Sequence, residues 1–324
     1  MTSLITQPGT GPSPGTDANA PGLAGLGRVL TIVEALRAAD DLDLLDQLRE
    51  PTDIDDLTGV DGRGAELVLT VLGHYGVVRC VDHRWQRSIE PELLRWWLKA
   101  QEPIHDLLRT GEPAGNVADP AQAASIYPDV VDLLGRMTEP HVAHLITQLR
   151  IPGPAVLELA SGSAPWSRAL GERDPHLRFT LVDLPGVAER SAAAMSATGL
   201  DARSTVVADD LFTVELEDRF DLVIVAGMCR LVGAEANARL FGRIGQWCRP
   251  GGTVAVFDAL DTRQAREAGL AVYRLSLATR TRDGRPWTPA HYADWLAASG
   301  FADISITATS QPDMSLLQAT RIKE

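Results

Sequence analysis

The sequence predicts an α/β protein, with a doubly wound parallel sheet that ends in an antiparallel hairpin and is preceded by a smaller helical domain. After residue 154, short apolar runs of strand length alternate with helical stretches, which is typical of a parallel sheet covered by helices on both faces. Before residue 150, apolar residues recur mainly at helical spacing. A Pro-Gly-Pro turn at residues 152–154 separates the two parts.

The composition limits the partners that the protein can have. With 324 residues, of which 45% are hydrophobic and 23% charged, the chain is long enough for two folded domains. The net charge is −13, residues 1–150 carry −10 of it, and no cluster of Lys and Arg suits a nucleic acid. We find no run of about 18 uncharged apolar residues, so no membrane partner is expected. The three cysteines lie far apart and form no C-x-x-C pair, which indicates a cytoplasmic protein.

The first part of the chain has the pattern of a winged helix. Residues 1–22 hold four Pro, four Gly and one charge, and we expect a disordered leader there. Two short helices are predicted over residues 23–48 and a longer one over residues 64–75. Two short strands at residues 76–81 and 85–88 would form the wing.

This module lacks the charge of a DNA reader. The second helix of a winged helix usually contacts the DNA, but here it offers only Arg63, with Asp61 and Glu66 beside it. We therefore expect an oligomerisation module and a homodimer. Further helices are predicted over residues 93–108 and 127–149, with a loop at residues 112–124. The expected domains are thus a leader at 1–22, a dimerisation domain at 23–150 and a sheet domain at 151–324.

The sheet domain follows an alternating order of strands and helices. Helices are predicted to start near Pro165, Gly186 and Ala234, and another spans residues 289–299. The predicted parallel strands are residues 155–159, 178–183, 204–207, 220–226 and 253–258. Two terminal strands, at residues 304–309 and 315–320, form the closing hairpin.

The turn after the first strand favours a nucleoside that carries positive charge. Small residues at 160, 162 and 164 let the backbone approach a ligand, while the G-x-G-x-x-G fingerprint and a phosphate-binding Lys-Ser/Thr are absent. Asp183 ends the second strand, where a carboxylate can accept both hydroxyls of a ribose, and Glu158 is expected to face the same crevice. S-adenosylmethionine, with its sulfonium and ammonium groups, fits such an acidic pocket.

Four segments in this order resemble the bacterial small-molecule O-methyltransferases, a family that includes plant phenolic methyltransferases. They are Val156 to Trp166, Val182 to Val187, Asp209 to Phe212, and the Arg-Pro-Gly-Gly-Thr of residues 249–253. The resemblance covers nearly the whole chain, because the family has a winged-helix dimerisation domain before its class I methyltransferase domain with a Rossmann-like sheet.

The resemblance implies where S-adenosylmethionine, or its product S-adenosylhomocysteine, would bind. Gly162 would contact the methionine moiety, Asp183 the ribose, and Asp210 with Leu211 or Phe212 the adenine. Leu184 and Glu158 are further predicted cofactor-binding residues. Where the family usually has glycine, this chain has Ala160 and Ala164, and the second adds a methyl group near the cofactor.

The resemblance also shows a departure in the catalytic residues. The position of the family's catalytic His falls on Arg230, whose guanidinium stays protonated and cannot accept a hydroxyl proton. The two acids that orient this His correspond to Asp258, which is present, and Pro286, which cannot replace one. His144 and His141 are predicted near the cleft as further candidates, and His144 is the one that we retain as catalytic.

Three accounts of the activity remain open. In the first, which we prefer, the enzyme methylates a small aromatic or anionic metabolite by proximity and orientation, and Arg230 holds an anionic group of that substrate. In the second, it binds S-adenosylmethionine but hydroxylates, decarboxylates, catalyses a pericyclic step or closes a ring in the cofactor. In the third, it binds without turnover.

The sequence offers candidates for a substrate pocket but not for a metal site. Four large side chains are candidates to line the pocket of a planar substrate: Tyr127, Met137, Trp166 and Trp287. No third ligand lies at metal spacing from the two histidines, so no metal is expected.

Overall fold

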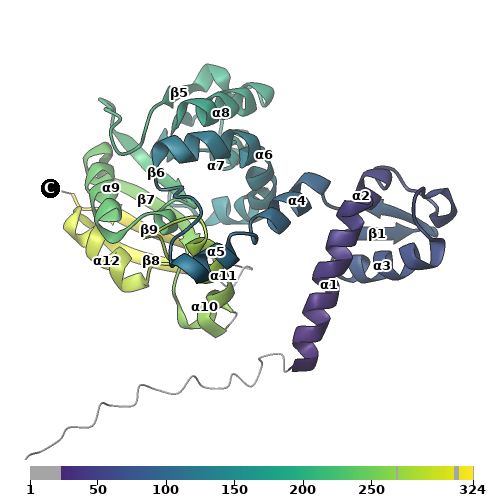
Figure 1. Cartoon of the computed structure of the whole chain (residues 1–324). Coiled ribbons are helices and arrows are strands. Elements are labelled where there is room, and N and C mark those ends of the chain that lie inside the picture. The colour runs from purple at the N-terminus through teal and green to yellow at the C-terminus, as the bar shows by residue number, and fades with distance from the viewer. Residues whose placement is uncertain (1–22, 268, 310–313, 324) are drawn as a thin grey trace, which may run out of the picture. The chain divides into compact units, whose positions relative to one another are not determined.

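The computed structural model describes residues 23–267, 269–309 and 314–323, and it divides the chain into two compact units, residues 1–99 and 100–324 (Figure 1). The expected leader at residues 1–22 lies outside the described residues. The division lies before the Pro-Gly-Pro turn that sequence analysis chose as the boundary. The reason is that helix α6 (Pro120–Leu145) packs against α7 (Pro165–Arg173) and α8 (Pro185–Ala197) of the sheet unit.

Over its described residues, 23–99, the first unit consists of four helices, one 3-10 turn and one hairpin. Its elements are α1 (Leu23–Asp41), α2 (Leu44–Gln47), η1 (Ile54–Asp56), α3 (Gly62–His74), β1 (Val78–Val81), β2 (Arg84–Arg87) and α4 (Pro91–Lys99). The two strands pair antiparallel through a turn in which Asp82 and His83 have φ values of 51° and 64°, as a tight hairpin turn requires. A core of buried leucines, which includes Leu45, Leu69 and Leu94, holds the unit together.

The second unit is built on a seven-stranded sheet with the order β5-β4-β3-β6-β7-β9-β8. The strands are β3 (Ala155–Leu159), β4 (Arg178–Asp183), β5 (Ser204–Ala208), β6 (Phe220–Ala226), β7 (Cys248–Ala259), β8 (Phe301–Ala308) and β9 (Met314–Arg321). The first five are parallel, and β9 pairs antiparallel with both β7 and β8. The predicted sheet and its closing hairpin are confirmed.

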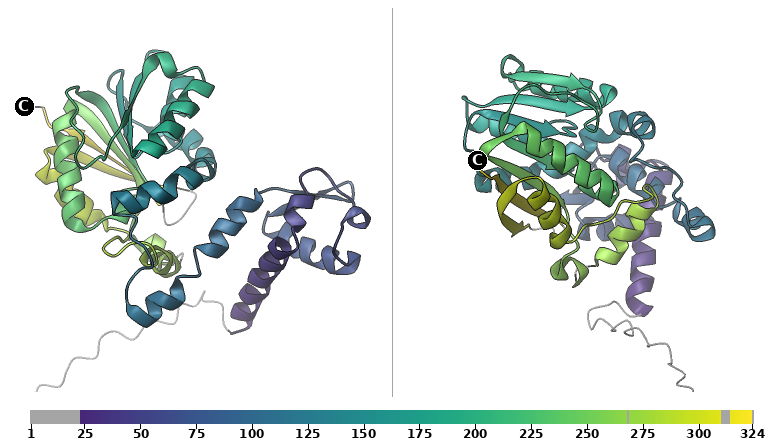
Figure 2. Two further views of the ribbon diagram at one scale, coloured as in Figure 1. Left: turned by 45° about the horizontal axis from the view of Figure 1, so that its top comes forward. Right: turned by 90° about the vertical axis from the view of Figure 1, so that its left-hand side faces the viewer.

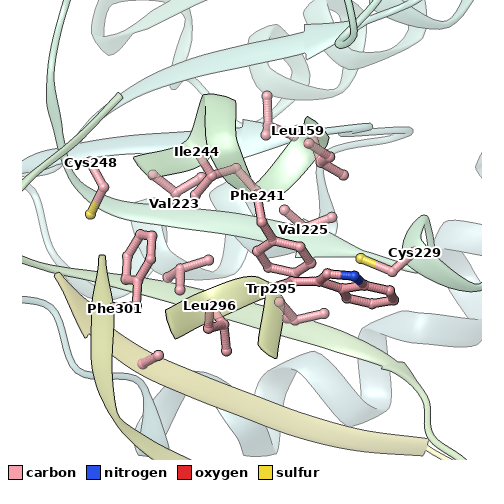
Figure 3. Packing of buried hydrophobic residues seen from close by; sticks show 14 of the residues in the cluster. Leu159, Val223, Val225, Cys229, Phe241, Ile244, Cys248, Trp295, Leu296 and Phe301 are labelled. Atoms are coloured by element: carbon pink, nitrogen blue, oxygen red, sulfur yellow. The ribbon is translucent and has the colours of Figure 1, made fainter. Parts of the chain in front are cut away.

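Helices cover both faces of this sheet, α9 (Ala234–Trp247) and α12 (Pro289–Ala298) on one face and α6, α7 and α8 on the other (Figure 2). Along β3, Val156 packs into one core cluster and Leu157 into the other, because successive side chains of a strand point to opposite faces. Figure 3 shows the cluster under α9 and α12, where Phe241 stacks on Trp295 with ring centroids 5.8 Å apart.

Several helices differ from the prediction. The single helix expected over residues 93–108 is two helices, α4 and α5 (Ile104–Thr110), and Pro103 directly precedes the second. Helix α6 starts at Pro120 within the expected loop, because the Asp119 carboxylate caps it by accepting from the N–H groups of Ala121 and Gln122. Sequence analysis missed α10 (Arg263–Glu267) and α11 (Leu270–Ala278). The remaining short turns are η2 (Ile146–Gln148), η3 (Asp201–Arg203) and η4 (Cys229–Leu231).

Helix α6 lies tightly against the loops that follow the strands. A side chain on Gly162, in the turn after β3, would meet Val131 of α6 at 2.9 Å, and one on Gly186 would meet Pro128 at 2.9 Å. The backbone of the helix and these loops therefore have no room for larger residues at the contacts. Within the described ranges, none of the helices combines the length and the apolar character needed to cross a bilayer.

Candidate functional site

The turn between β3 and α7 is held in a strained, fixed conformation. Ala160, Gly162 and Ala164 have φ values of 51°, 58° and 55°, a region that costs an alanine about 1 kcal/mol. Ser191 of α8 donates its hydroxyl to the Gly162 carbonyl at 2.5 Å and lies 2.9 Å from the Ser161 hydroxyl. The conformation that the family reaches with glycines is thus reached here with two alanines.

Asp183 joins this turn to the end of β4. One carboxylate oxygen accepts from the Gly162 N–H at 2.8 Å, and the other accepts from the Leu184 N–H at 2.8 Å. Burial raises the pKa of Asp183 to about 6, while these two N–H groups act in the opposite direction. Each oxygen keeps a lone pair for a further donor. The structure thus brings Gly162 and Asp183 together, and the cofactor contacts predicted for them stay a prediction.

A pocket of about 490 Å³ opens beside Asp183 at the carboxyl ends of the strands. Six of the predicted site residues line it, namely Tyr127, Asp183, Leu184, Asp210, Leu211 and Phe212. Seven more residues line it that sequence analysis did not propose: Val117, Ala118, Pro120, Ala123, Asp209, Met228 and Leu231. Several of these residues lie at the start of α6 or in the segment before it. The Asp-Pro pair at residues 119 and 120, which is typical of a helix start, is the sequence signal that could have placed them.

Arg230 is held by Asp258 near this pocket. Its Nη1 donates to Asp258 at 2.6 Å, its backbone N–H donates to the other carboxylate oxygen at 3.1 Å, and Asp258 is fully buried. The guanidinium carbon lies 5.8 Å from the centre of the Tyr273 ring, which α11 supplies. Burial acts to lower the pKa of Arg230, but Tyr273 and Asp258 raise it more, so the guanidinium stays charged.

The loop before α12 closes around Arg230 from another side. A side chain on Gly284 would meet the Arg230 carbonyl oxygen at 2.5 Å, and Thr281 donates its hydroxyl to the Leu231 carbonyl at 2.7 Å. Pro286 is buried in this loop next to Trp287, which forms a strand bridge with Leu260. The backbone at residues 230 and 231 is therefore held in place. Neither Arg230 nor Asp258 is among the residues that line the pocket, whereas Met228 and Leu231 are.

Glu158 does not serve as expected. Its carboxylate is buried under the start of α7, where it accepts from the N–H of Ser167 at 2.9 Å and from the Ser167 hydroxyl. It is not among the residues that line the pocket. Burial raises its pKa to about 7, and the two Ser167 contacts lower it in part. Glu158 therefore anchors α7 instead of lining the pocket. Its position on β3 directs its side chain toward the helices that cover this face of the sheet.

His144 is also displaced from the site. It is exposed at the end of α6, where its ring lies 3.0 Å from the Gln148 amide. Tyr127, at the pocket end of the same helix, is 17 residues away, which is roughly 25 Å along a helix axis. His144 is not among the residues that line the pocket, because a helix carries residues 17 positions apart to distant points along its axis.

Three of the four proposed substrate-pocket residues belong elsewhere. Trp166 is fully buried against Phe257, with centroids 5.5 Å apart, and Trp287 is buried with its indole N–H donated to the Cys229 carbonyl at 3.0 Å. Met137 is 37% exposed and does not line the pocket. Only Tyr127 of the four does so. In the part of the chain that the structure describes, no group of three His, Cys, Asp or Glu could hold a metal ion.

Comparison with known proteins agrees with this geometry. The sequence profile of the O-methyltransferase domain family matches residues 141–302, half of the chain. The chain belongs to this family. Its members are enzymes, and this one has the sheet, the glycine turn and the strand-end carboxylate that the resemblance implied.

The curated relatives come from natural-product pathways among others. The chain is 28% identical over 238 residues to the tetracenomycin polyketide synthesis 8-O-methyl transferase of Streptomyces glaucescens, covering 71% of this chain and 68% of that protein. It is 23% identical over 281 residues to the 3-hydroxy-5-methyl-1-naphthoate 3-O-methyltransferase of Streptomyces sahachiroi, covering 78% and 80%. Aclacinomycin 10-hydroxylase of Streptomyces purpurascens is 29% identical over 174 residues, 52% of this chain and 46% of that one.

Solved structures confirm the fold. Human N-acetylserotonin methyltransferase, in complex with S-adenosylmethionine, matches with a TM-score of 0.74 at 18% identity, over 93% of this chain and 97% of that one. The class I methyltransferase architecture, with helices before it in the chain, is therefore established.

Proposed function

We propose that this protein is an S-adenosylmethionine-dependent methyltransferase that acts on a small secondary metabolite without a histidine base. The observation that carries the proposal is the Asp183 carboxylate, which is bonded to the Gly162 N–H at 2.8 Å and faces the pocket. A strand-end carboxylate next to a glycine turn is suited to a ribose. The relatives named for O-methylation support the reaction class.

The pocket fits this cofactor in shape and in charge. Leu184, Leu211 and Phe212 provide apolar walls for an adenine, and the Asp210 carboxylate, which accepts from the Phe212 N–H at 2.9 Å, stands beside them. With Asp183 and Asp209, three carboxylates line one pocket, which suits a ligand with a sulfonium and an ammonium group. When bound, the cofactor supplies a methyl group on a positively charged sulfur.

The chain's own residues then hold and orient the acceptor. Arg230 cannot take a proton, since its guanidinium stays charged next to Asp258. Its part is to bind and to position, with Tyr127 and Met228 as neighbouring walls. The rate of such an enzyme comes mainly from proximity and alignment, which can supply about 7 kcal/mol or more.

A non-methylating reaction is the second candidate, and the Arg230–Asp258 pair favours it, since the pair occupies the positions of the family's base and one orienting acid. A relative named as a hydroxylase shows that other chemistry occurs among similar proteins. Incubation with methyl-labelled S-adenosylmethionine and candidate metabolites separates the two. Label in an acceptor product supports methyl transfer. Product without label supports the second candidate. Binding without any turnover would contradict both candidate activities.

We also infer that the first unit makes the protein a homodimer. In α1, Leu26, Val29 and Leu30 lie on one helix face and are 52%, 48% and 58% exposed, an apolar stripe suited to a second copy. Light scattering is expected to give the mass of two chains, and Leu26→Glu with Leu30→Glu to give one. Leu42→Glu, at a residue equally exposed but outside α1, is the control and should keep the dimer.

A further inference from the structure

Positive charge lies beside one end of the pocket, and negative charge lines the other. Arg230 is not among the residues that line the pocket, but Met228 and Leu231, on either side of it in the chain, do line it. Tyr127 lines the pocket too, and its pKa is raised by burial but lowered in part by Arg230 and Arg280. The carboxylates of Asp183, Asp209 and Asp210 line the other side. We expect a molecule that extends from these acids to Met228 and Leu231 to lie beside the Arg230 guanidinium.

The guanidinium of Arg230 retains donors for a ligand. Its Nη1 bonds to Asp258, and among the described residues no other hydrogen bond of the side chain is formed; its Nε has no partner. The side chain is 20% exposed. Its Nη2 lies 3.3 Å from the position that a side chain on Gly227 would take, so the glycine leaves room beside the guanidinium. A guanidinium with unused N–H groups is suited to an oxyanion.

The groups that line the pocket offer no general base for a neutral hydroxyl. Burial raises the pKa of the Tyr127 phenol, so this group keeps its proton at neutral pH. Asp183 holds the N–H groups of Gly162 and Leu184 and is assigned to the ribose. Asp209 and Asp210 each accept a backbone N–H as well, beside the apolar walls for the adenine. Among the described residues that line the pocket near Met228 and Leu231, none is a proton acceptor of this kind.

We propose that Arg230 selects an acceptor whose nucleophilic oxygen is already ionised at neutral pH, a carboxylate or an acidified phenol or enol. This inference rests on the proposed function and names its substrate class. The oxyanion forms the new bond to the methyl carbon, the carbon–sulfur bond breaks, and its electron pair goes to sulfur. No proton has to be removed in this step, so a histidine is not needed. Arg230 orients the oxyanion and discriminates against neutral analogues.

Binding of matched neutral and anionic probes tests the proposal without depending on turnover. Calorimetry with the protein saturated in S-adenosylhomocysteine compares 2-naphthoate with 2-naphthamide and benzoate with benzamide, pairs of nearly equal shape. We expect the carboxylate of at least one pair to bind about tenfold or more tightly, the effect of one charge-assisted contact.

The variants separate the arginine from the net charge of the protein. Arg230→Gln alone leaves the buried Asp258 carboxylate without its ion-pair partner, which can unfold the protein. It is therefore combined with Asp258→Asn. We expect this double variant to reduce the preference to less than about threefold. Arg239→Gln removes an exposed guanidinium 6.0 Å from the Phe212 ring and is expected to keep the preference.

Each outcome decides one part of the reasoning. Selective carboxylate binding that the double variant loses supports the proposal. If S-adenosylhomocysteine binds but no carboxylate is preferred to its amide, the substrate class is wrong while the proposed function stands. A preference that survives in the double variant overturns the role of Arg230. If S-adenosylhomocysteine itself does not bind, the proposed function fails, and the substrate class fails with it.

Discussion

The titration of Asp183 gives the sharpest test of the cofactor site. Without ligand, burial raises the pKa of this carboxyl to about 6, above its ordinary value of 3.8. Ribose hydroxyls donate to the ionised form, so binding favours that form and lowers the pKa in the complex. Affinity for S-adenosylhomocysteine should therefore be full well above pH 6 and should fall as the pH drops through this value.

The size of the effect follows from the pKa. At about pH 7.5 nearly all of the carboxyl is ionised, and at about pH 5 roughly one tenth is, so the apparent dissociation constant rises about tenfold. Asp183→Ala removes the acceptor altogether and should weaken binding at least about tenfold at pH 7.5, since two buried hydroxyls lose their partner. Asp183→Asn keeps the shape but does not titrate, so its weaker binding should be nearly independent of pH between these values.

Isothermal titration calorimetry at five pH values measures all three proteins. Asp174→Asn is a matched control, because Asp174 also accepts a backbone N–H, from His176 at 2.8 Å, but does not line the pocket. The control should bind as the wild type does at every pH. Unchanged affinity in Asp183→Ala, or the same pH slope in Asp183→Asn as in the wild type, would refute the ribose assignment.

Three further predictions concern packing, buried charge and the missing base. Gly245→Ala should destabilise the protein by about 2 kcal/mol, because its Cβ would lie 2.6 Å from a backbone oxygen. Gly242→Ala in the same helix meets nothing within 4 Å and should stabilise the protein by up to about 1 kcal/mol. Denaturant unfolding measures both changes. Glu158, with a folded pKa raised to about 7 from 4.5, contributes stability below pH 4.5 that is lost as the pH rises to 7, about 3 kcal/mol in all. Glu158→Gln should flatten this part of the stability profile, and an unchanged profile would mean that the buried carboxyl does not titrate there. Arg230→His should not restore methyl transfer to neutral phenols, because Pro286 stands where an orienting acid is needed; a large gain in labelled product would show that orientation by Asp258 is enough.

The sheet could be predicted closely because its signal is local. The strands β3, β4 and β6 have the predicted bounds, since each is a short apolar run between a turn and a helix start. Once the strands are known, the pairing of Gly162 with Asp183 follows, because the carboxyl ends of neighbouring parallel strands lie at one edge. The cofactor contacts assigned to these two residues stay a prediction.

The predictions for the acceptor side were less accurate. Whether these side chains line the pocket depends on which face of a helix each one occupies after packing. Trp166 follows Pro165 in the first turn of α7, and only the packed structure shows that this turn directs the indole into the core against Phe257. Likewise, the sequence does not say whether the Glu158 carboxylate faces a ligand or accepts from the N–H of Ser167 in the first turn of α7, as it does in the structure. Tertiary contacts decide the direction of both side chains, and the spacing of residues in the sequence does not predict these contacts.

Helix α6 has a consequence for how two ligands share the site. The same helix presents Tyr127 to the pocket and Val131 to the turn at Gly162, where an added Cβ would lie 2.9 Å from the valine. A ligand that displaces α6 would therefore act on both places. We expect donor and acceptor to change each other's affinity through this helix, and by reciprocity by the same factor.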